Sequence, residues 1–235
     1  MTKRTLPKVE RPIFPITLPV SGKKTTHTTF SVKEEKILLL AKESGDIDHI
    51  ITALKQVIEN CLHDVSIEKL PLADVEYAML KMRSSSINNQ IDFTIRDPQN
   101  FEEVALSVDL SDVSVYSEPE HTNIIKVGES MYVKMRYPTI DEFAILLKSK
   151  TDAQKHYDIM IGCMDEVING EEMYPLKDFS REEIDEFIDG FSETDIAAMK
   201  QFFATMPRLR HSVNYVNSDG KNQTFVIEGL EAFFV

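Results

Sequence analysis

Glycine is scarce in this chain of 235 residues: there are eight, and no two lie closer than eight positions. A phosphate-binding loop needs closely spaced glycines, because the backbone N–H groups must come close to the anion. Neither G-x-G-x-x-G nor G-x-x-x-x-G-K-[ST] occurs, and G-x-S-x-G, H-E-x-x-H and C-x-x-C are also absent. The sequence therefore indicates no nucleotide-binding loop and no hydrolase motif of these kinds, and we expect no enzyme activity.

Cysteine is scarcer still, with only Cys61 and Cys163, which lie far apart in helical patterns. This usage fits a reducing cytosol better than a disulfide scaffold. The nearest approach to a metal-ligand cluster is Cys61-x-His63-Asp64, with Asp46, Asp48 and His49 upstream. A zinc site needs about four convergent ligands, so we favour a buried cysteine beside solvated polar groups. No metal and no cofactor is expected.

Long apolar runs are missing as well. The longest have five residues, as in Ile37 to Ala41, against the roughly 20 that a membrane helix needs. The first residues, MTKRTLPKVERP, are basic, but no apolar segment of the kind found in a secretory signal follows them. The sequence therefore predicts neither a membrane span nor secretion.

Acidic side chains outnumber basic ones by 39 to 26, which gives a formal charge of −13. This balance argues against binding to a nucleic-acid backbone, because contacts with phosphate need Lys and Arg. Residues 151–206 hold 14 of the acids and only four basic side chains. Some of these acids favour helix N-termini or are simply solvated. The alternative is a surface that attracts a basic partner, and its candidate residues are Glu182, Glu183, Asp185 and Glu186.

Residues 1–29 form a second distinctive segment, with four of the ten prolines and six basic side chains against one acidic. Proline fixes φ and removes a donor, so we expect an extended, basic arm. The arm carries apolar candidates for partner binding: Ile13, Phe14, Ile16 and Leu18. Packing of the arm on its own domain and docking on a partner are left as equal alternatives.

Capping signals and apolar periodicity predict helices on both sides of a region of strands. Capping boxes begin at Ser31, Thr139, Ser180 and Ser192. The expected helices cover residues 31–43, 46–62, 71–83, 140–149, 152–169, 180–190 and 193–206.

Alternation with period two predicts antiparallel strands at 90–96, 104–110, 112–116 and 131–137. A second alternating pair, 208–217 and 223–228, surrounds Ser218-Asp219-Gly220-Lys221, which is a strong hairpin signal. The predicted fold class is α+β, with helical segments on both sides of a central antiparallel sheet and a C-terminal β-hairpin.

The chain ends in an apolar tail that includes Leu230, Phe233 and Phe234. Burial of one Phe contributes about 1.5–3 kcal/mol, so we expect the tail to lie in the core or in an interface. The predicted segments are an arm at 1–29, helices and sheet at 30–137, acidic helices at 138–206 and a hairpin with tail at 207–235.

Three stretches carry a family resemblance: residues 15–44 (PITLPVSGKKTTHTTFSVKEEKILLLAKES), 70–87 (LPLADVEYAMLKMRSSSI) and 206–234 (MPRLRHSVNYVNSDGKNQTFVIEGLEAFF). Together they cover about a third of the chain and resemble the baseplate-hub family of T4-like contractile-tailed bacteriophages, its hub subunits and hub-assembly chaperones. The resemblance implies a non-enzymatic protein, made in the cytoplasm of the infected bacterium, that helps to build the central part of the tail baseplate.

We therefore expect an assembly factor that binds other baseplate or hub proteins, with no nucleic acid or membrane as partner. Two alternatives stay open: a structural hub subunit that remains in the virion tail baseplate, and an acidic inhibitor or nucleic-acid mimic directed at a host enzyme. The contrast between the basic arm and the acidic segment also allows a homo-oligomer.

Overall fold

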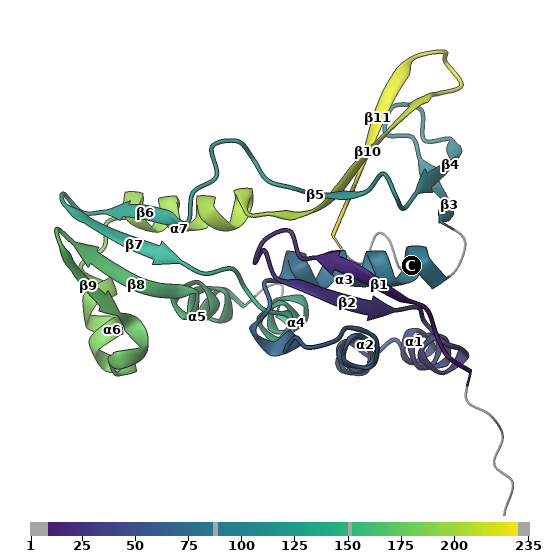
Figure 1. Ribbon diagram of the computed structural model, residues 1–235. Coiled ribbons are helices and arrows are strands. Elements are labelled where there is room, and N and C mark those ends of the chain that lie inside the picture. Colours follow the sequence, from purple (N-terminus) through teal and green to yellow (C-terminus); the bar gives the residue numbers. More distant parts are fainter. Residues whose placement is uncertain (1–8, 87–88, 150–151, 230–235) are drawn as a thin grey trace, which may run out of the picture.

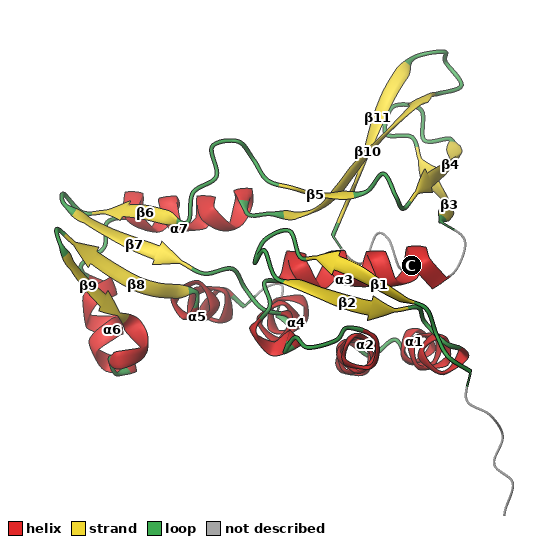
Figure 2. Ribbon diagram, viewed as in Figure 1, coloured by secondary structure: helices red, strands yellow, loops and turns green. Residues whose placement is uncertain are grey.

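The computed structural model describes residues 9–86, 89–149 and 152–229. Seven α-helices and eleven strands, all in antiparallel pairs, occur in these ranges, which confirms the α+β class. Figure 2 shows how the helices and strands are distributed. The helices are α1 Val32–Ser44, α2 Ile47–Cys61, α3 Leu72–Ser86, α4 Ile140–Lys148, α5 Ala153–Gly162, α6 Arg181–Asp189 and α7 Glu193–Thr205. The strands are β1 Ile13–Thr17, β2 Lys24–Thr28, β3 Gln90–Arg96, β4 Glu103–Asp109, β5 Ser114–Tyr116, β6 Ile124–Val127, β7 Met131–Met135, β8 Met164–Asn169, β9 Glu172–Pro175, β10 Arg208–Val216 and β11 Asn222–Glu228.

The described part of the N-terminal arm is folded back on itself as a hairpin. Strands β1 and β2 pair antiparallel, with Ile13 opposite Thr28 and Thr17 opposite Lys24. Gly22 has φ of 68°, a conformation that favours glycine, and its N–H donates to the carbonyl of Leu18. Pro15 is tolerated because β1 is an edge strand, where a missing donor is harmless. The hairpin lies against the helices that follow it, as Figure 1 shows.

Helix α3 is buried on almost every side and lies at the centre of the N-terminal half. Val75, Ala78, Met79 and Met82, which the apolar period places on one face, are all buried. The opposite side is also covered, because Leu80 belongs to a different hydrophobic cluster. In the first cluster, α3 packs with α1, α2, α4 and the β1–β2 hairpin. Helix α3 is therefore shared between two cores.

Two buried carboxylates in the first turns of α3 bind distant backbone. Asp74 is fully buried, and its carboxylate accepts the N–H groups of Val20 (2.8 Å) and Ser21 (2.9 Å) in the β1–β2 turn. Glu76 accepts the N–H of Leu209 in β10 at 3.3 Å. A buried backbone N–H without a partner is costly, so these contacts fix both hairpins on α3.

The second core lies on the four-stranded sheet β6-β7-β8-β9, which packs with α5, α6 and α7. Here the sequence-based prediction was wrong in part: the helix expected over 152–169 ends at Gly162, and residues 164–169 form β8. In Met164–Asn169 the buried Met164 and Val167 face the second core while β7 supplies the hydrogen-bonding partner. Pairing with β7 and β9 decided between helix and strand in this short segment of mixed polarity. Strand β6 was not predicted at all.

The strands expected to form one central sheet are antiparallel, but they divide among three sheets. Strands β3 and β4 form a hairpin, β5 joins the C-terminal hairpin in the order β11-β10-β5, and β7 belongs to the four-stranded sheet. Because β7 pairs with β8, hydrogen bonds cross the segment boundary that we placed near residue 137. The division of the chain into four segments stays a prediction.

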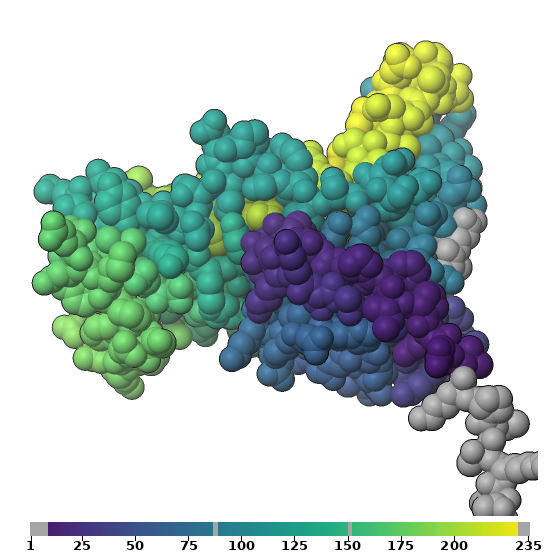
Figure 3. Space-filling view, in the orientation of Figure 1, coloured from purple at the N-terminus to yellow at the C-terminus, as the bar shows by residue number. Residues whose placement is uncertain are grey.

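The predicted C-terminal hairpin is present, with Arg210 opposite Glu228 and Val216 opposite Asn222. It projects from the body of the molecule in Figure 3, and the β3–β4 hairpin lies beside it. The two hairpins touch through the rings of Phe93 and Phe225, whose centroids are 6.1 Å apart, and through Tyr215, which donates to Asp97 at 2.8 Å. A third core beneath them contains Leu80, Val108 and Leu209.

The helices α1, α2, α4, α5 and α6 form a row along the elongated body (Figure 1). The β1–β2 hairpin covers the α1 end of this row, and the β6–β9 sheet covers the α6 end. The described part of the N-terminal arm and the acidic helix α6 therefore lie toward opposite ends of the body.

We expect Asp74→Asn to lower the free energy of unfolding by about 1–3 kcal/mol, because the amide can accept only one of the two N–H groups now bound. Urea denaturation monitored by circular dichroism measures this. Asp112→Asn, at an exposed position, is the control and should change the stability by less than about 0.5 kcal/mol. Equal stability of the two variants would contradict the role given to Asp74.

Candidate partner-binding surfaces

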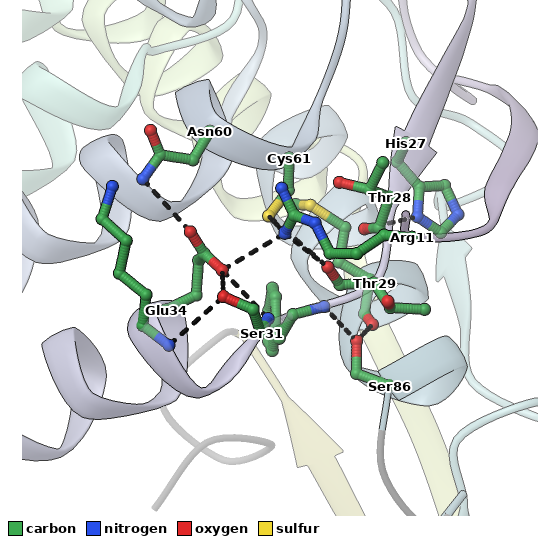
Figure 4. A network of polar contacts seen from close by, with 12 residues as sticks. Arg11, His27, Thr28, Thr29, Ser31, Glu34, Asn60, Cys61 and Ser86 are labelled. Carbon is green, nitrogen blue, oxygen red and sulfur yellow. Dashed lines mark hydrogen bonds and ion pairs between the residues drawn. The ribbon is translucent and has the colours of Figure 1, made fainter. Parts of the chain in front are cut away.

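One carboxylate holds the start of the described chain on the first core (Figure 4). Arg11 donates through Nη1 to Glu34 Oε2 at 3.2 Å and to the carbonyl oxygen of Thr29 at 2.9 Å. The same Glu34 oxygen accepts the N–H of Ser31 at 2.9 Å and also the Ser31 hydroxyl. The capping box predicted for α1 is confirmed, and its glutamate is also the ion-pair partner of the arm.

Glu34 is buried, yet its surroundings favour the charged form. Burial alone raises the pKa of this carboxyl, but the hydrogen bonds from Ser31 and the charge of Arg11 outweigh that effect. The pKa therefore lies below its ordinary value of 4.5. At neutral pH the carboxylate is ionised and fixes Arg11, near the start of the described residues, on the first core.

Of the residues weighed as a metal cluster, His63 helps to hold β2 to the end of α2, whereas Asp46 caps α2 and Asp48 pairs with Lys148. Thr26 Oγ1 lies 3.0 Å from His63 Nδ1, and His27 forms an isolated bridge with Leu62. Cys61 is buried, and its burial raises the pKa of the thiol. Within the described ranges, no group of three or more His, Cys, Asp or Glu side chains is arranged to hold a metal ion.

The four apolar candidates in the arm differ in exposure. Ile16 and Leu18 are buried, Leu18 completely, and they belong to the first core. In this chain they pack inside the first core, and their contact with a partner stays a prediction. Phe14 is half-buried and stacks on His27, with ring centroids 5.5 Å apart. Ile13 is 62% exposed, so it alone among the four offers a largely open apolar side chain.

The outer face of α1 carries three exposed apolar side chains that sequence reasoning missed, here called the α1 stripe, and the charged Lys36 and Glu43 are exposed on the same face. Val32, Leu39 and Leu40 are 81%, 56% and 55% exposed. At 3.6 residues per turn they fall within about 100° of the helix circumference, opposite the buried Glu34 and Ala41. The signal was available, because five consecutive apolar residues from Ile37 to Ala41 cannot all face one core.

The four acidic candidates on α6 also differ in their contacts. Glu183 caps its own helix, because it accepts the N–H of Ser180 at 2.8 Å, and Asp185 accepts a hydrogen bond from Arg181 Nε at 2.8 Å. Glu182 and Glu186 are exposed. The structure thus brings the four together on one short helix and gives two of them local structural roles.

Beside α6 lies an apolar cavity of about 340 Å³. Strands β7, β8 and β9 contribute one wall, and α6 with the segment before it contributes the other. Its apolar lining includes Met131, Val167, Tyr174, Leu176, Phe179 and Phe187. Glu183 stands at its edge. A cavity of this kind suits an apolar side chain that is followed or preceded by positive charge.

The tail candidates Leu230, Phe233 and Phe234 lie outside the described residues. Their assignment to a core or an interface stays a prediction.

Comparison with known families decides which class of protein these surfaces belong to. The family model described as T4 bacteriophage base plate protein matches residues 11–235. The chain belongs to this family. The match covers the β1–β2 hairpin, all three cores, the outer face of α1 and the cavity beside α6. The resemblance seen in the sequence is therefore confirmed at the level of a T4-like baseplate protein. No curated protein and no solved structure matches the chain.

Membership of the base plate family gives the chain a structural or assembly role in the phage baseplate and other baseplate proteins as partners. Among the described helices, none is long and apolar enough to cross a membrane. Exposed apolar and charged surfaces on this baseplate protein are therefore read as candidate protein–protein contacts.

We expect Glu34→Gln to lower the free energy of unfolding at pH 7 by about 1–2 kcal/mol, because the ion pair is lost while glutamine keeps the capping box. The pKa of Glu34 is lowered on folding, so this stabilisation is complete above pH 4.5 and is lost as the pH falls through the folded pKa.

Urea titrations from pH 7 to pH 3 test this expectation. The stabilities of wild type and Glu34→Gln should converge at low pH. Glu35→Gln, at the exposed neighbouring position, is the control and should follow wild type throughout. A gap between wild type and Glu34→Gln that does not shrink at low pH would exclude an ionised Glu34 as its cause.

Proposed function

We propose that this baseplate protein is a non-enzymatic assembly factor, a chaperone, that binds baseplate hub subunits in the cytoplasm of the infected bacterium. The observation that carries the proposal is the group of exposed apolar side chains Val32, Leu39 and Leu40 on the outer face of α1, which they share with the charged Lys36 and Glu43. No described residue buries these side chains, and apolar surface of this kind is typical of a contact with another protein.

The position of α1 supports this role. It is the last helix of the row in Figure 1, and Val32, Leu39 and Leu40 on it are exposed. The Arg11–Glu34 pair and the capping box fix the start of the helix and hold the stripe in a defined orientation. A rigid apolar face loses little conformational entropy on binding.

A structural subunit that remains in the virion is the second candidate, because base plate family membership fits it equally well. Mass spectrometry of purified tails separates the two. A chaperone should be missing from finished tails, whereas a structural subunit should be present in them in a fixed ratio to the other baseplate proteins.

We expect Leu39→Asp together with Leu40→Asp to abolish co-elution with hub subunits, because charged groups would have to be buried in an apolar contact. The measurement is co-expression with candidate hub subunits followed by size-exclusion chromatography. Thermal unfolding of the double variant should match wild type, since both side chains are mostly exposed.

Ile145→Asp is the matched control, because Ile145 is also an exposed apolar residue on a helix, at 43% exposure, but lies on α4. It should leave co-elution unchanged. Failure of wild type to co-elute with any hub subunit, even at low salt, would refute the proposal. Binding that vanishes with added salt and is competed by DNA would instead support an acidic inhibitor or nucleic-acid mimic.

A further inference from the structure

The cavity beside α6 combines two features that select its ligand. The lining side chains Met131, Tyr174, Leu176 and Phe179 are apolar, and Phe179 is partly exposed. Glu183 lies at the edge, and Glu182 and Glu186 are exposed on the same helix. The ligand should therefore carry apolar side chains and positive charge in a short segment.

The first ten residues of the chain, MTKRTLPKVE, have this composition. They contain three basic side chains against one acidic, with Leu6 and Val9 between the charges. Pro7 favours an extended backbone, which a narrow cavity can accept. Arg11, directly after them, is held by Glu34, so the segment begins at a fixed point of the body.

The molecule's own cavity is poorly placed for its own N-terminal segment. Arg11 is fixed on Glu34 at the start of α1, and in Figure 1 the row of helices has α1 at one end of the elongated body and α6 at the other. Ten extended residues span at most about 33–36 Å. A segment that starts at Arg11 would therefore have to follow the surface along the whole row of helices to reach the cavity of its own chain.

We propose that the cavity beside α6 binds the N-terminal segment of a second copy of this chain. Leu6 or Val9 enters the apolar cavity, and Lys3, Arg4 and Lys8 lie against the acidic side of α6. The contact joins the α1 end of one copy to the α6 end of the next, so it is heterologous and can extend or close into a ring. This contact between copies does not depend on which hub subunit the α1 stripe binds.

Each exposed ion pair contributes little to the free energy of binding, and salt screens the attraction between its charges. The association should therefore be weak at physiological salt and strengthen at low salt. The specificity of the association comes from a segment that carries apolar and basic side chains together. A basic segment without the apolar side chains would be attracted to any acidic surface and would not fill the cavity.

Two variants of the full protein test the proposal by sedimentation velocity over a range of concentrations at low salt. One lacks residues 2–8 and keeps Arg11. The other carries Glu182→Lys and Glu186→Lys, which leaves the Glu183 cap and the Asp185–Arg181 pair intact. Wild type should self-associate, and each variant alone should associate at least tenfold more weakly.

A mixture of the two variants gives the decisive result. One retains an intact cavity and the other an intact N-terminal segment, so together they should form a dimer and nothing larger. Glu59→Lys with Glu68→Lys, at exposed positions away from α6, is the matched control and should associate like wild type.

A second measurement on wild type does not depend on whether the variants fold. The fluorescent peptide MTKRTLPKVE should bind wild type, and a scrambled peptide should bind at least tenfold more weakly. The proposal is overturned if wild type stays monomeric at low salt, if the control variant also loses association, or if the mixture fails to dimerise. Equal binding of the peptide to wild type and to the α6 variant would also overturn it.

Discussion

Buried carboxylates that accept backbone N–H groups from distant segments are the interaction on which this fold depends. Asp74 holds the turn of the β1–β2 hairpin, and Glu76 holds β10. The partly buried Glu142 accepts the N–H of Thr139 in its own capping box at 2.8 Å and also binds Arg136, which joins the end of β7 to α4. Burying a charge is costly unless it is fully hydrogen-bonded. Each of these acids is bonded, so each fixes a junction between elements.

These junctions matter because the chain has three hydrophobic clusters and not one. Apolar contacts within a cluster are non-directional and do not determine how one cluster sits beside the next. Hydrogen bonds to carboxylates are directional and supply that information. Helix α3 belongs to the first and third clusters, and the Arg136–Glu142 pair lies between the first and second. The elongated body of Figure 3 follows from this arrangement.

For a T4-like baseplate protein, an elongated body with different surfaces at its two ends is suited to joining other subunits. The α1 end offers exposed apolar side chains, and the α6 end offers an apolar cavity lined in part by Glu183, with Glu182 and Glu186 exposed on the same helix. Because the two surfaces differ in chemistry, they can select different partners or different copies. The excess negative charge thus divides into buried acids with structural roles and exposed acids that are available for recognition.

Local patterns in the sequence determined the elements: the capping box at Ser31 placed the start of α1, and Asp219-Gly220 placed the turn between β10 and β11. These features depend on neighbouring residues, so a sequence can predict them. Only the tertiary structure decided that Ile16 and Leu18 are buried, that 164–169 is a strand and that the expected central sheet is divided. Each of these outcomes depends on a partner far away in the chain, and periodicity describes which face is apolar but not what covers it.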